Sequence, residues 1–325
     1  MRNAMGALCA ALALVACAPA DPAISVASAN AQGGALFVAN KRGNSLSKID
    51  LASGAEVQRV SSCANPHELA TSPDGSHVAL ACYGGTSVDI FRTDDLARVA
   101  SIDLGTNARP HGILWHGNGS IYATAEGRKS IFRIVGPLGD NPQTIESGTG
   151  QLGSHMLAVS PDGRLAWTTD LGSKTVTRID LLTRRAPLSV TVGEEPEGIS
   201  LAPDGTALWV SARGSNKAFE LDPLTMEVRR EVATGRFPLR IAIRPQGDVA
   251  VTSDLVDGGL SVIDTRTGQL LRSIAVSSPS EAEARQQVTI LWSDDGQRIY
   301  AAETGTDTVA EVDYASGQVL RRLKT

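Results

Sequence analysis

The chain has 325 residues, of which 42% are hydrophobic and 20% charged, and its formal net charge is −5. This composition is typical of a folded globular protein and argues against disorder. The acidic balance gives no reason to expect nucleic acid or an anionic membrane surface as a partner. The length suits either two average domains or one large all-β domain.

Residues 1–16 have the features of an export signal. Arg2 supplies a positive charge, and Ala4–Ala16 is an apolar stretch of signal-peptide length. The stretch ends in Leu14-Val15-Ala16-Cys17, which resembles the lipobox of bacterial lipoproteins. That resemblance implies lipid on Cys17 and an outer-membrane location, with residues 17–32 as a tether. The alternative is ordinary secretion to the periplasm. No later apolar run approaches the ~20 residues of a membrane-spanning helix, so the lipid is the only membrane contact expected.

The cysteines fit export to an oxidising compartment. Cys9 leaves with the signal and Cys17 carries the lipid, so Cys63 and Cys82 remain as a pair. We therefore predict a structural disulfide between Cys63 and Cys82. The pair has no C-x-x-C spacing, so a redox or metal role is not indicated.

A short turn that ends in glycine recurs along the chain. Its clearest copy is Ser160-Pro161-Asp162-Gly163, and Asp-Gly between two apolar runs predicts a hairpin because glycine adopts the positive φ of the turn. The copies lie 42 to 49 residues apart, with their glycines at Gly75, Gly119, Gly163, Gly205, Gly247 and Gly296. Four short strands fit into each interval, which is the pattern of a β-propeller.

The repeats predict an all-β fold: a seven-bladed β-propeller of four-stranded antiparallel blades over residues 33–325. Second, third and fourth strands are visible for seven blades, but inner strands for only six. Either Ala23–Ala29 supplies the missing inner strand or the first blade has three strands. We expect Glu281–Arg285 to form a solvated loop, and the four tryptophans to fill the core: Trp115, Trp167, Trp209 and Trp292.

The repeats resemble those of YVTN-family β-propellers. The matching segments are Phe37-Val38-Ala39-Asn40, Ser160-Pro161-Asp162-Gly163 and Ser261-Val262-Ile263-Asp264. The resemblance covers about residues 33–325 and implies the propeller fold. It implies no single function, because propellers host many unrelated activities.

The copies differ most where the inner strands begin, at the predicted funnel mouth. Eight residues before the turn glycine, three consecutive blades carry His67, His111 and His155, and the fourth carries Glu197. The next position supplies Glu68 and Arg240 in two of the blades. Loops that we expect at the same mouth add Lys41, Tyr83, Glu126, Asp170 and Arg213.

Three interpretations of this column of residues remain open. In the first, a polar residue after proline simply suits the start of an inner strand. In the second, His67, His111 and His155 bind a divalent metal, because three imidazoles suit Zn²⁺ or Cu²⁺. The difficulty is geometric: equivalent points on adjacent strands are expected to lie too far apart to share an ion bound at ~2 Å.

The third interpretation is acid–base chemistry. The fold resembles that of bacterial propeller lactonases and fungal muconate-cycloisomerising propellers, which implies His, Glu and Arg at the funnel. His155 would act as base, Glu197 as proton donor or acceptor, and Arg240 as the group that holds a substrate carboxylate.

We predict an exported, monomeric propeller that acts as a binding or accessory protein. Its mouth would present a surface of His, Glu and Arg side chains to a small ligand, a cofactor or an envelope protein. The ligand-binding residues we expect are His67, Glu68, Tyr83, His111, Asp170 and Arg213. A lactonase- or cycloisomerase-like enzyme is the alternative. Apart from a divalent metal, the sequence indicates no cofactor.

Overall fold

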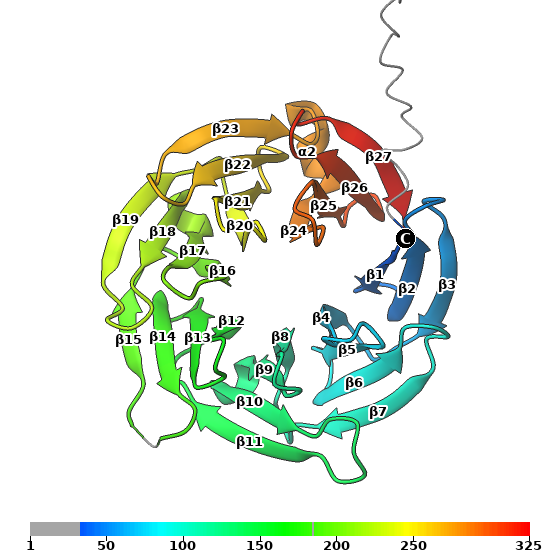
Figure 1. The fold of residues 1–325 in the computed structure, drawn as a ribbon, viewed down its shortest axis with the longest axis vertical. Coiled ribbons are helices and arrows are strands. Elements are labelled where there is room, and N and C mark those ends of the chain that lie inside the picture. The colour runs from blue at the N-terminus through cyan, green and yellow to red at the C-terminus, as the bar shows by residue number, and fades with distance from the viewer. Residues whose placement is uncertain (1–32, 184) are drawn as a thin grey trace, which may run out of the picture.

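The computed structural model describes residues 33–183 and 185–325, which form seven β-sheets arranged in a ring (Figure 1). The sheets follow one another along the chain, and consecutive strands within each sheet pair antiparallel. The prediction of a seven-bladed β-propeller is confirmed. The predicted export signal, Cys17 and Ala23–Ala29 lie outside the described residues.

Blade 1 has three strands in the described part of the chain, and blades 2 to 7 have four each. Blades 1 to 3 contain, in order, β1 (Ala35–Asn40), β2 (Ser45–Asp50), β3 (Glu56–Ser61); β4 (Pro66–Thr71), β5 (His77–Cys82), β6 (Ser87–Arg92), β7 (Arg98–Asp103); β8 (Pro110–Trp115), β9 (Ile121–Ala125), the 3-10 helix η1 (Glu126–Arg128), β10 (Ser130–Val135) and β11 (Gln143–Gly148).

Blade 4 contains β12 (Ser154–Val159), β13 (Leu165–Asp170), β14 (Thr175–Asp180) and β15 (Leu188–Thr191), and blade 5 contains β16 (Pro196–Leu201), β17 (Leu208–Ala212), the 3-10 helix η2 (Arg213–Ser215), β18 (Lys217–Leu221) and β19 (Val228–Ala233). Blade 6 contains β20 (Pro238–Ile243), β21 (Val249–Asp254), β22 (Gly259–Asp264) and β23 (Leu270–Ala275). The helix α2 (Pro279–Arg285) leads into blade 7, which contains β24 (Gln287–Trp292), β25 (Arg298–Glu303), β26 (Thr308–Asp313) and β27 (Val319–Lys324). The predicted Ser160–Gly163 turn joins β12 to β13, and its glycine has a φ of +71°.

The hydrophobic core is divided into clusters that lie between neighbouring blades. Seven clusters occur, and each contains side chains of two adjacent blades. One of them packs Leu36 and Ile49 of blade 1 against Tyr300, Val309 and Leu323 of blade 7. Among the described residues the ring therefore closes by side-chain packing, without a strand shared between its two ends. The four tryptophans are buried in the core, as predicted.

The inner edge of blade 1 differs from that of the other blades. In blades 2 to 7 nearly every residue of the second strand is buried, whereas in β1 only Leu36 is. Because β1 is the innermost described strand of its blade, its residues lack the cover that an inner strand gives elsewhere (Figure 1).

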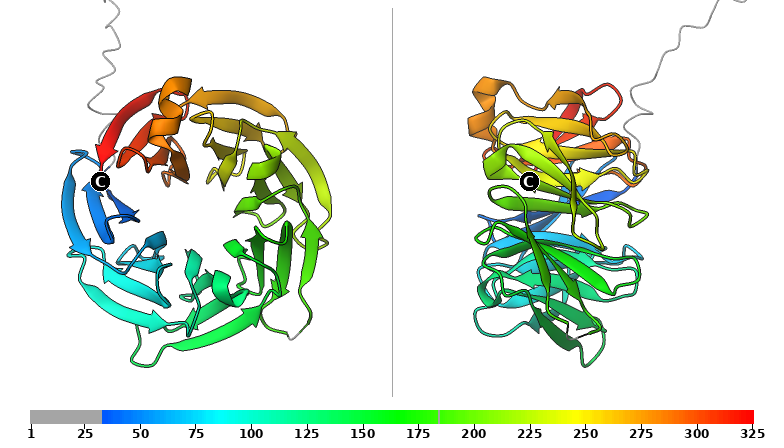
Figure 2. Two further views of the ribbon diagram at one scale, coloured as in Figure 1. Left: turned by 180° about the vertical axis from the view of Figure 1, so that it is seen from behind. Right: turned by 90° about the vertical axis from the view of Figure 1, so that its left-hand side faces the viewer.

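The expected loop at Glu281–Arg285 is instead a helix, α2. Ser278 and Glu281 form a capping box, Pro279 occupies the first turn, and Arg285 bonds Glu281 at 2.9 Å one turn away. These signals are sufficient to start and hold a short helix. The helix directly precedes β24 and projects from the face of the disc where the inner strands begin (Figure 2).

Cys63 and Cys82 form a disulfide with their Cα atoms 5.6 Å apart. Cys63 lies in the connection from blade 1 to blade 2, and Cys82 ends β5. The bridge therefore fastens this connection to the second strand of blade 2. No helix in the described part of the chain is long and apolar enough to cross a membrane.

Candidate functional site

A repeated backbone geometry starts every described inner strand. The residue before the strand has a positive φ in all six copies: Asn65, Arg109, Gly153, Glu195, Phe237 and Gln286. Within the first residues of the strand the pairing register then shifts, which marks a β-bulge. Bulges redirect side chains, and here they fall on or beside the positions of the predicted column.

The bulges bring three histidines of successive blades into contact. The ring centroids of His67 and His111 are 3.9 Å apart, and those of His111 and His155 are 3.6 Å apart. Neighbouring imidazoles therefore meet at the bulged starts of the strands, although the sequence analysis expected the three to lie too far apart to share one ion.

Carboxylates and a guanidinium continue this stack into a closed network around the axis. His155 contacts Glu126 through Nδ1 at 2.5 Å and Glu197 through Nε2 at 2.9 Å. Arg240 donates to Glu197 at 2.6 Å and to Glu68 at 2.7 Å. Glu68 lies beside His67, with 3.7 Å between Oε1 and Nδ1. Blades 2 to 6 all contribute, and Arg240 of blade 6 meets Glu68 of blade 2.

Burial and charge set the protonation of the network. Burial raises the pKa values of Glu68 and Glu197, but Arg240 and the neighbouring histidines outweigh it and hold both at about 2. Burial lowers the pKa of His155, yet its hydrogen bonds to Glu126 and Glu197 raise it above the usual value. Burial, together with the charges of His155 and His67, lowers the pKa of His111 well below its ordinary value. These shifts favour the protonated form of His155 and the neutral form of His111.

Loop residues surround the network at the mouth. Tyr83 donates its hydroxyl to Glu126 at 2.8 Å, and Arg109 bonds the same hydroxyl and lies over the tyrosine ring. Burial and the Glu126 carboxylate raise the pKa of Tyr83 to about 12. Lys41 lies 2.8 Å from His67 Nε2, and Arg213 pairs with Glu197 at 2.6 Å.

The structure brings nearly all of the predicted residues together. His67, Glu68, Tyr83, His111, His155, Glu197, Arg213 and Arg240 all belong to the network or contact it. Glu126 and Lys41 were expected at the mouth but not as members of the site, and Arg109 was missed. Its one signal is its place directly before Pro110, in the left-handed position that precedes the inner strand.

Asp170 does not join the network. Its side chain is fully buried inside blade 4. Four hydroxyl groups of that blade donate to it at 2.6–3.0 Å: those of Ser154, Thr168, Thr175 and Thr177. Burial raises the pKa of Asp170. This carboxyl holds the strands of its blade together rather than facing a ligand.

Hydroxyl groups on four second strands anchor the inner strands of the following blades. Thr124 accepts the Gly112 N–H in its own blade at 2.8 Å and donates to the His155 carbonyl of the next blade at 2.6 Å. Thr169 donates in the same way to the Glu197 carbonyl at 2.7 Å. Ser211 and Ser253 repeat the arrangement. The sequence analysis did not find these hydroxyls.

Two sets of three potential metal ligands lie in the network, each with its donor atoms within 4.8 Å of one another. One set is His67, Glu68 and His111, and the other is His111, Glu126 and His155. His111 belongs to both. The predicted set of three histidines does not occur as one group among the described residues, because each compact set contains two histidines and a glutamate.

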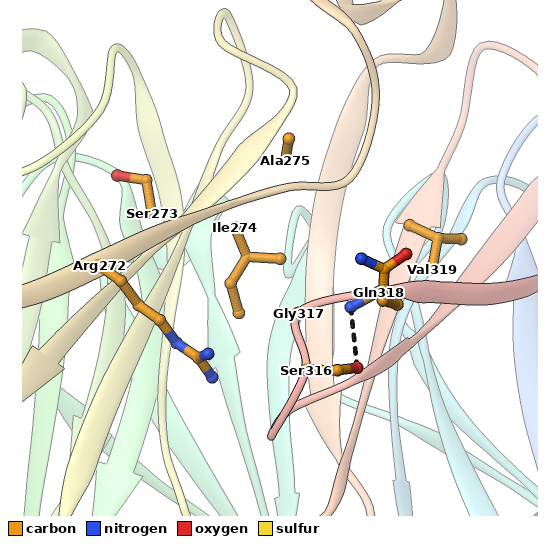
Figure 3. Close-up of a pocket in the computed structure, with 8 residues that line it drawn as sticks. All are labelled: Arg272, Ser273, Ile274, Ala275, Ser316, Gly317, Gln318 and Val319. Carbon is orange, nitrogen blue, oxygen red and sulfur yellow. Dashed lines mark hydrogen bonds between the residues drawn. The ribbon is translucent and has the colours of Figure 1, made fainter.

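A separate groove of about 520 Å³ lies on the outer rim of the ring, between β23 and the β26–β27 turn (Figure 3). Arg272 points its guanidinium toward the turn, where it bonds the carbonyls of Tyr314 and Ala315. The groove contains no other ionisable side chain. Its chemistry is poorer than that of the funnel mouth, which remains the candidate site.

The fold and the site define a seven-bladed propeller with a polar, ionisable funnel mouth. A family model described as outer membrane protein assembly factor BamB matches residues 147–325, and the chain belongs to this family. No curated protein sequence matches the chain significantly.

Solved structures share the fold at low identity. A protein of unknown function from Desulfotomaculum acetoxidans is 14% identical, covers 88% of this chain and 94% of its own, and has a TM-score of 0.72. Inactive virginiamycin B lyase from Staphylococcus aureus with quinupristin is 18% identical over 84% of this chain and 89% of its own, with a TM-score of 0.69. Kuenenia stuttgartiensis hydrazine synthase is 17% identical over 90% and 92%, with a TM-score of 0.67.

Proposed function

We propose that this chain is an exported binding protein whose funnel mouth takes up a small anionic ligand. The observation that carries this proposal is the distribution of charge in the network. The side chains of Glu68, Glu126 and Glu197 are 14%, 13% and 4% exposed. Lys41 and Arg109, by contrast, are exposed. An anion that approaches the mouth therefore meets an ammonium and a guanidinium before it meets a carboxylate.

Arg213 extends this cationic rim to blade 5. Its side chain is half-buried against Glu197, and the exposed Glu195 beside it offsets part of its charge. The rim is thus most strongly cationic on the side of blades 1 to 3. Because propeller blades are rigid and their connections short, we expect binding without a large conformational change.

We expect a panel of carboxylates and phosphate, titrated calorimetrically into the purified chain, to reveal at least one ligand. The Lys41→Gln/Arg109→Gln double variant should bind it about 10- to 100-fold more weakly, since a charged hydrogen bond contributes ~1.5–3 kcal/mol. Lys174→Gln is the control, because Lys174 pairs with Glu194 outside the network. Equal affinities of the double variant and the wild type would refute an anion site at this mouth.

A lactonase- or isomerase-like enzyme is the second candidate, favoured by one observation. His155 is held between Glu126 and Glu197, which fixes the imidazole and raises its pKa, as suits a general acid better than the base first assigned to it. Arg240 is less suited to hold a substrate carboxylate, because its guanidinium already donates hydrogen bonds to Glu197 and Glu68. Hydrolysis of a lactone from a test panel by wild type, abolished by His155→Gln, would favour the enzyme. If wild type converts no member of the panel, the enzyme is refuted and the binding protein remains.

We also propose that lipid on Cys17 anchors the chain in the cell envelope. The lipobox-like sequence supports this, as does membership of a family whose description concerns outer membrane protein assembly. An envelope protein is accordingly a further partner to test. Wild type should incorporate labelled palmitate, and Cys17→Ala should appear in the soluble fraction. Absence of label from wild type would rule out the anchor.

A further inference from the structure

We propose that His111, His155 and Glu126 bind a divalent transition metal ion of the zinc class at the funnel mouth. Two imidazoles and one carboxylate are a donor set that suits Zn²⁺, and three protein ligands leave a fourth position open for a ligand. The inference concerns the same mouth as the proposed function, but it depends on different atoms and does not need the anion.

The geometry already gathers the donors. One donor atom from each residue lies within 4.8 Å of the other two. Glu126 stands on η1 directly after β9, and the two histidines stand on the bulged starts of β8 and β12. The three residues thus come from adjacent elements of blades 3 and 4, and small movements of side chains are sufficient to close them on one ion.

An unpartnered nitrogen points to a missing ligand. His111 is 1% exposed, and its Nδ1 has no hydrogen-bond partner among residues 33–183 and 185–325. A buried polar atom of this kind is costly to leave unsatisfied. A metal ion bound to His111 would supply the partner that this nitrogen lacks.

Groups around the three donors are placed as in known metal sites. His155 contacts Glu126 through Nδ1, which leaves Nε2 to bond the Glu197 carboxylate at 2.9 Å. A carboxylate on the far nitrogen of a ligating histidine orients the ring and increases its basicity. Tyr83 similarly bonds Oε2 of Glu126, while Oε1 faces His155. When a metal ion replaces the contact between His155 Nδ1 and Glu126 Oε1, the bonds of His155 to Glu197 and of Glu126 to Tyr83 can both remain.

The neighbouring charges favour the set of His111, Glu126 and His155 over the set of His67, Glu68 and His111. Glu68, in the set with His67 and His111, already accepts from the buried Arg240 at 2.7 Å, and Lys41 lies 2.8 Å from His67. A cation there would compete with two fixed cations. Glu126 makes no direct ion pair with an arginine or lysine in the part of the chain that the structure describes. Its partner His155 becomes a metal ligand when Nδ1 releases its proton, which a bound metal ion displaces.

The test is calorimetric titration of the full chain with ZnCl₂, free of other ligands. We expect one site per chain. His111→Leu and Glu126→Gln should weaken binding by more than about 100-fold, since loss of a ligand exceeds the 10–100-fold effect of an outer contact. Tyr83→Phe should cost about 10-fold. Glu231→Gln, the same change at an exposed glutamate that pairs with Lys217 outside the network, should leave affinity within about 3-fold. Glu68→Gln tests the other set of ligands.

His111→Leu and Glu126→Gln preserve shape, and their thermal unfolding should confirm that they fold. X-ray absorption of the zinc-loaded chain should show two imidazoles and a carboxylate. Loss of binding in Glu68→Gln but not in Glu126→Gln would overturn the assignment. Weak zinc binding that no variant changes would overturn it too. A chain that binds zinc but no anion would support this site and refute the proposed function, and the reverse result would do the opposite.

Discussion

Replacing Arg240 with alanine should destabilise the protein by about 3–5 kcal/mol, the usual cost of leaving a buried charge without its partner. The guanidinium is 8% exposed and bonds Glu68 at 2.7 Å and Glu197 at 2.6 Å. Its removal leaves Glu68 with His67 as its only charged neighbour among the described residues, whereas Glu197 keeps Arg213 and His155. Urea or guanidinium unfolding of the variant beside wild type measures the loss.

Lys217→Ala is the control, because Lys217 and Glu231 form an exposed pair, 44% and 52% accessible. Exposed pairs contribute ~0–1 kcal/mol. Adding Glu68→Gln to an Arg240→Met background should restore much of the lost stability, since the carboxylate that depends most on Arg240 is then neutral, while Glu197 keeps Arg213 and His155. Unchanged denaturation midpoints for Arg240→Ala would contradict the buried ion pairs.

The effect of Arg240→Ala should depend on pH. In wild type the folded-state pKa values of Glu68 and Glu197 are depressed to about 2 from a reference of 4.5. Their ionised forms therefore stabilise the fold above pH 4.5, and this contribution is lost as the pH falls toward 2. Without Arg240, burial is opposed only by His67 at Glu68 and by His155 and Arg213 at Glu197, so both pKa values rise. The stability gap between variant and wild type should narrow as the pH falls below these raised pKa values toward 2.

Loss of the Cys63–Cys82 disulfide should cost about 3 kcal/mol. The two cysteines are 19 residues apart, and a cross-link over a loop of that length restricts the unfolded chain by ~3 kcal/mol. Chemical unfolding of the Cys63→Ala/Cys82→Ala variant measures the change. Wild type treated with reductant should match the variant. Detection of two free thiols in protein isolated without reductant would exclude the bridge.

The repeat made much of the site predictable from sequence. Aligning the turn glycines places His67, His111, His155 and Glu197 at one structural position, and the structure gathers their side chains at one mouth. Strand periodicity is local and survives in a single sequence. It is therefore sufficient to give the blade order and the column of inner-strand residues.

Other features needed three-dimensional geometry. The bulges that bring the imidazoles together depend on pairing between strands and have no residue signature of their own. Arg240 and Glu68 are 172 residues apart and meet only because the ring closes. Asp170 ends the second strand of its blade, close to the loops of the mouth, but hydroxyls of its own blade surround it. Sequence position alone does not distinguish these two environments.

The interblade hydroxyls divide the mouth into a stiff side and a compliant side. Thr124 and Thr169 hold the backbone of His155 and Glu197 from the preceding blade. At the matching position blade 2 has Ala81, which carries no hydroxyl, so His111 lacks this support. The backbone at His155 and Glu197 is thus held by the preceding blade, whereas His111 has more freedom to shift when a ligand binds. A substitution at this position of one blade can therefore change how firmly the inner-strand residue of the next blade is held.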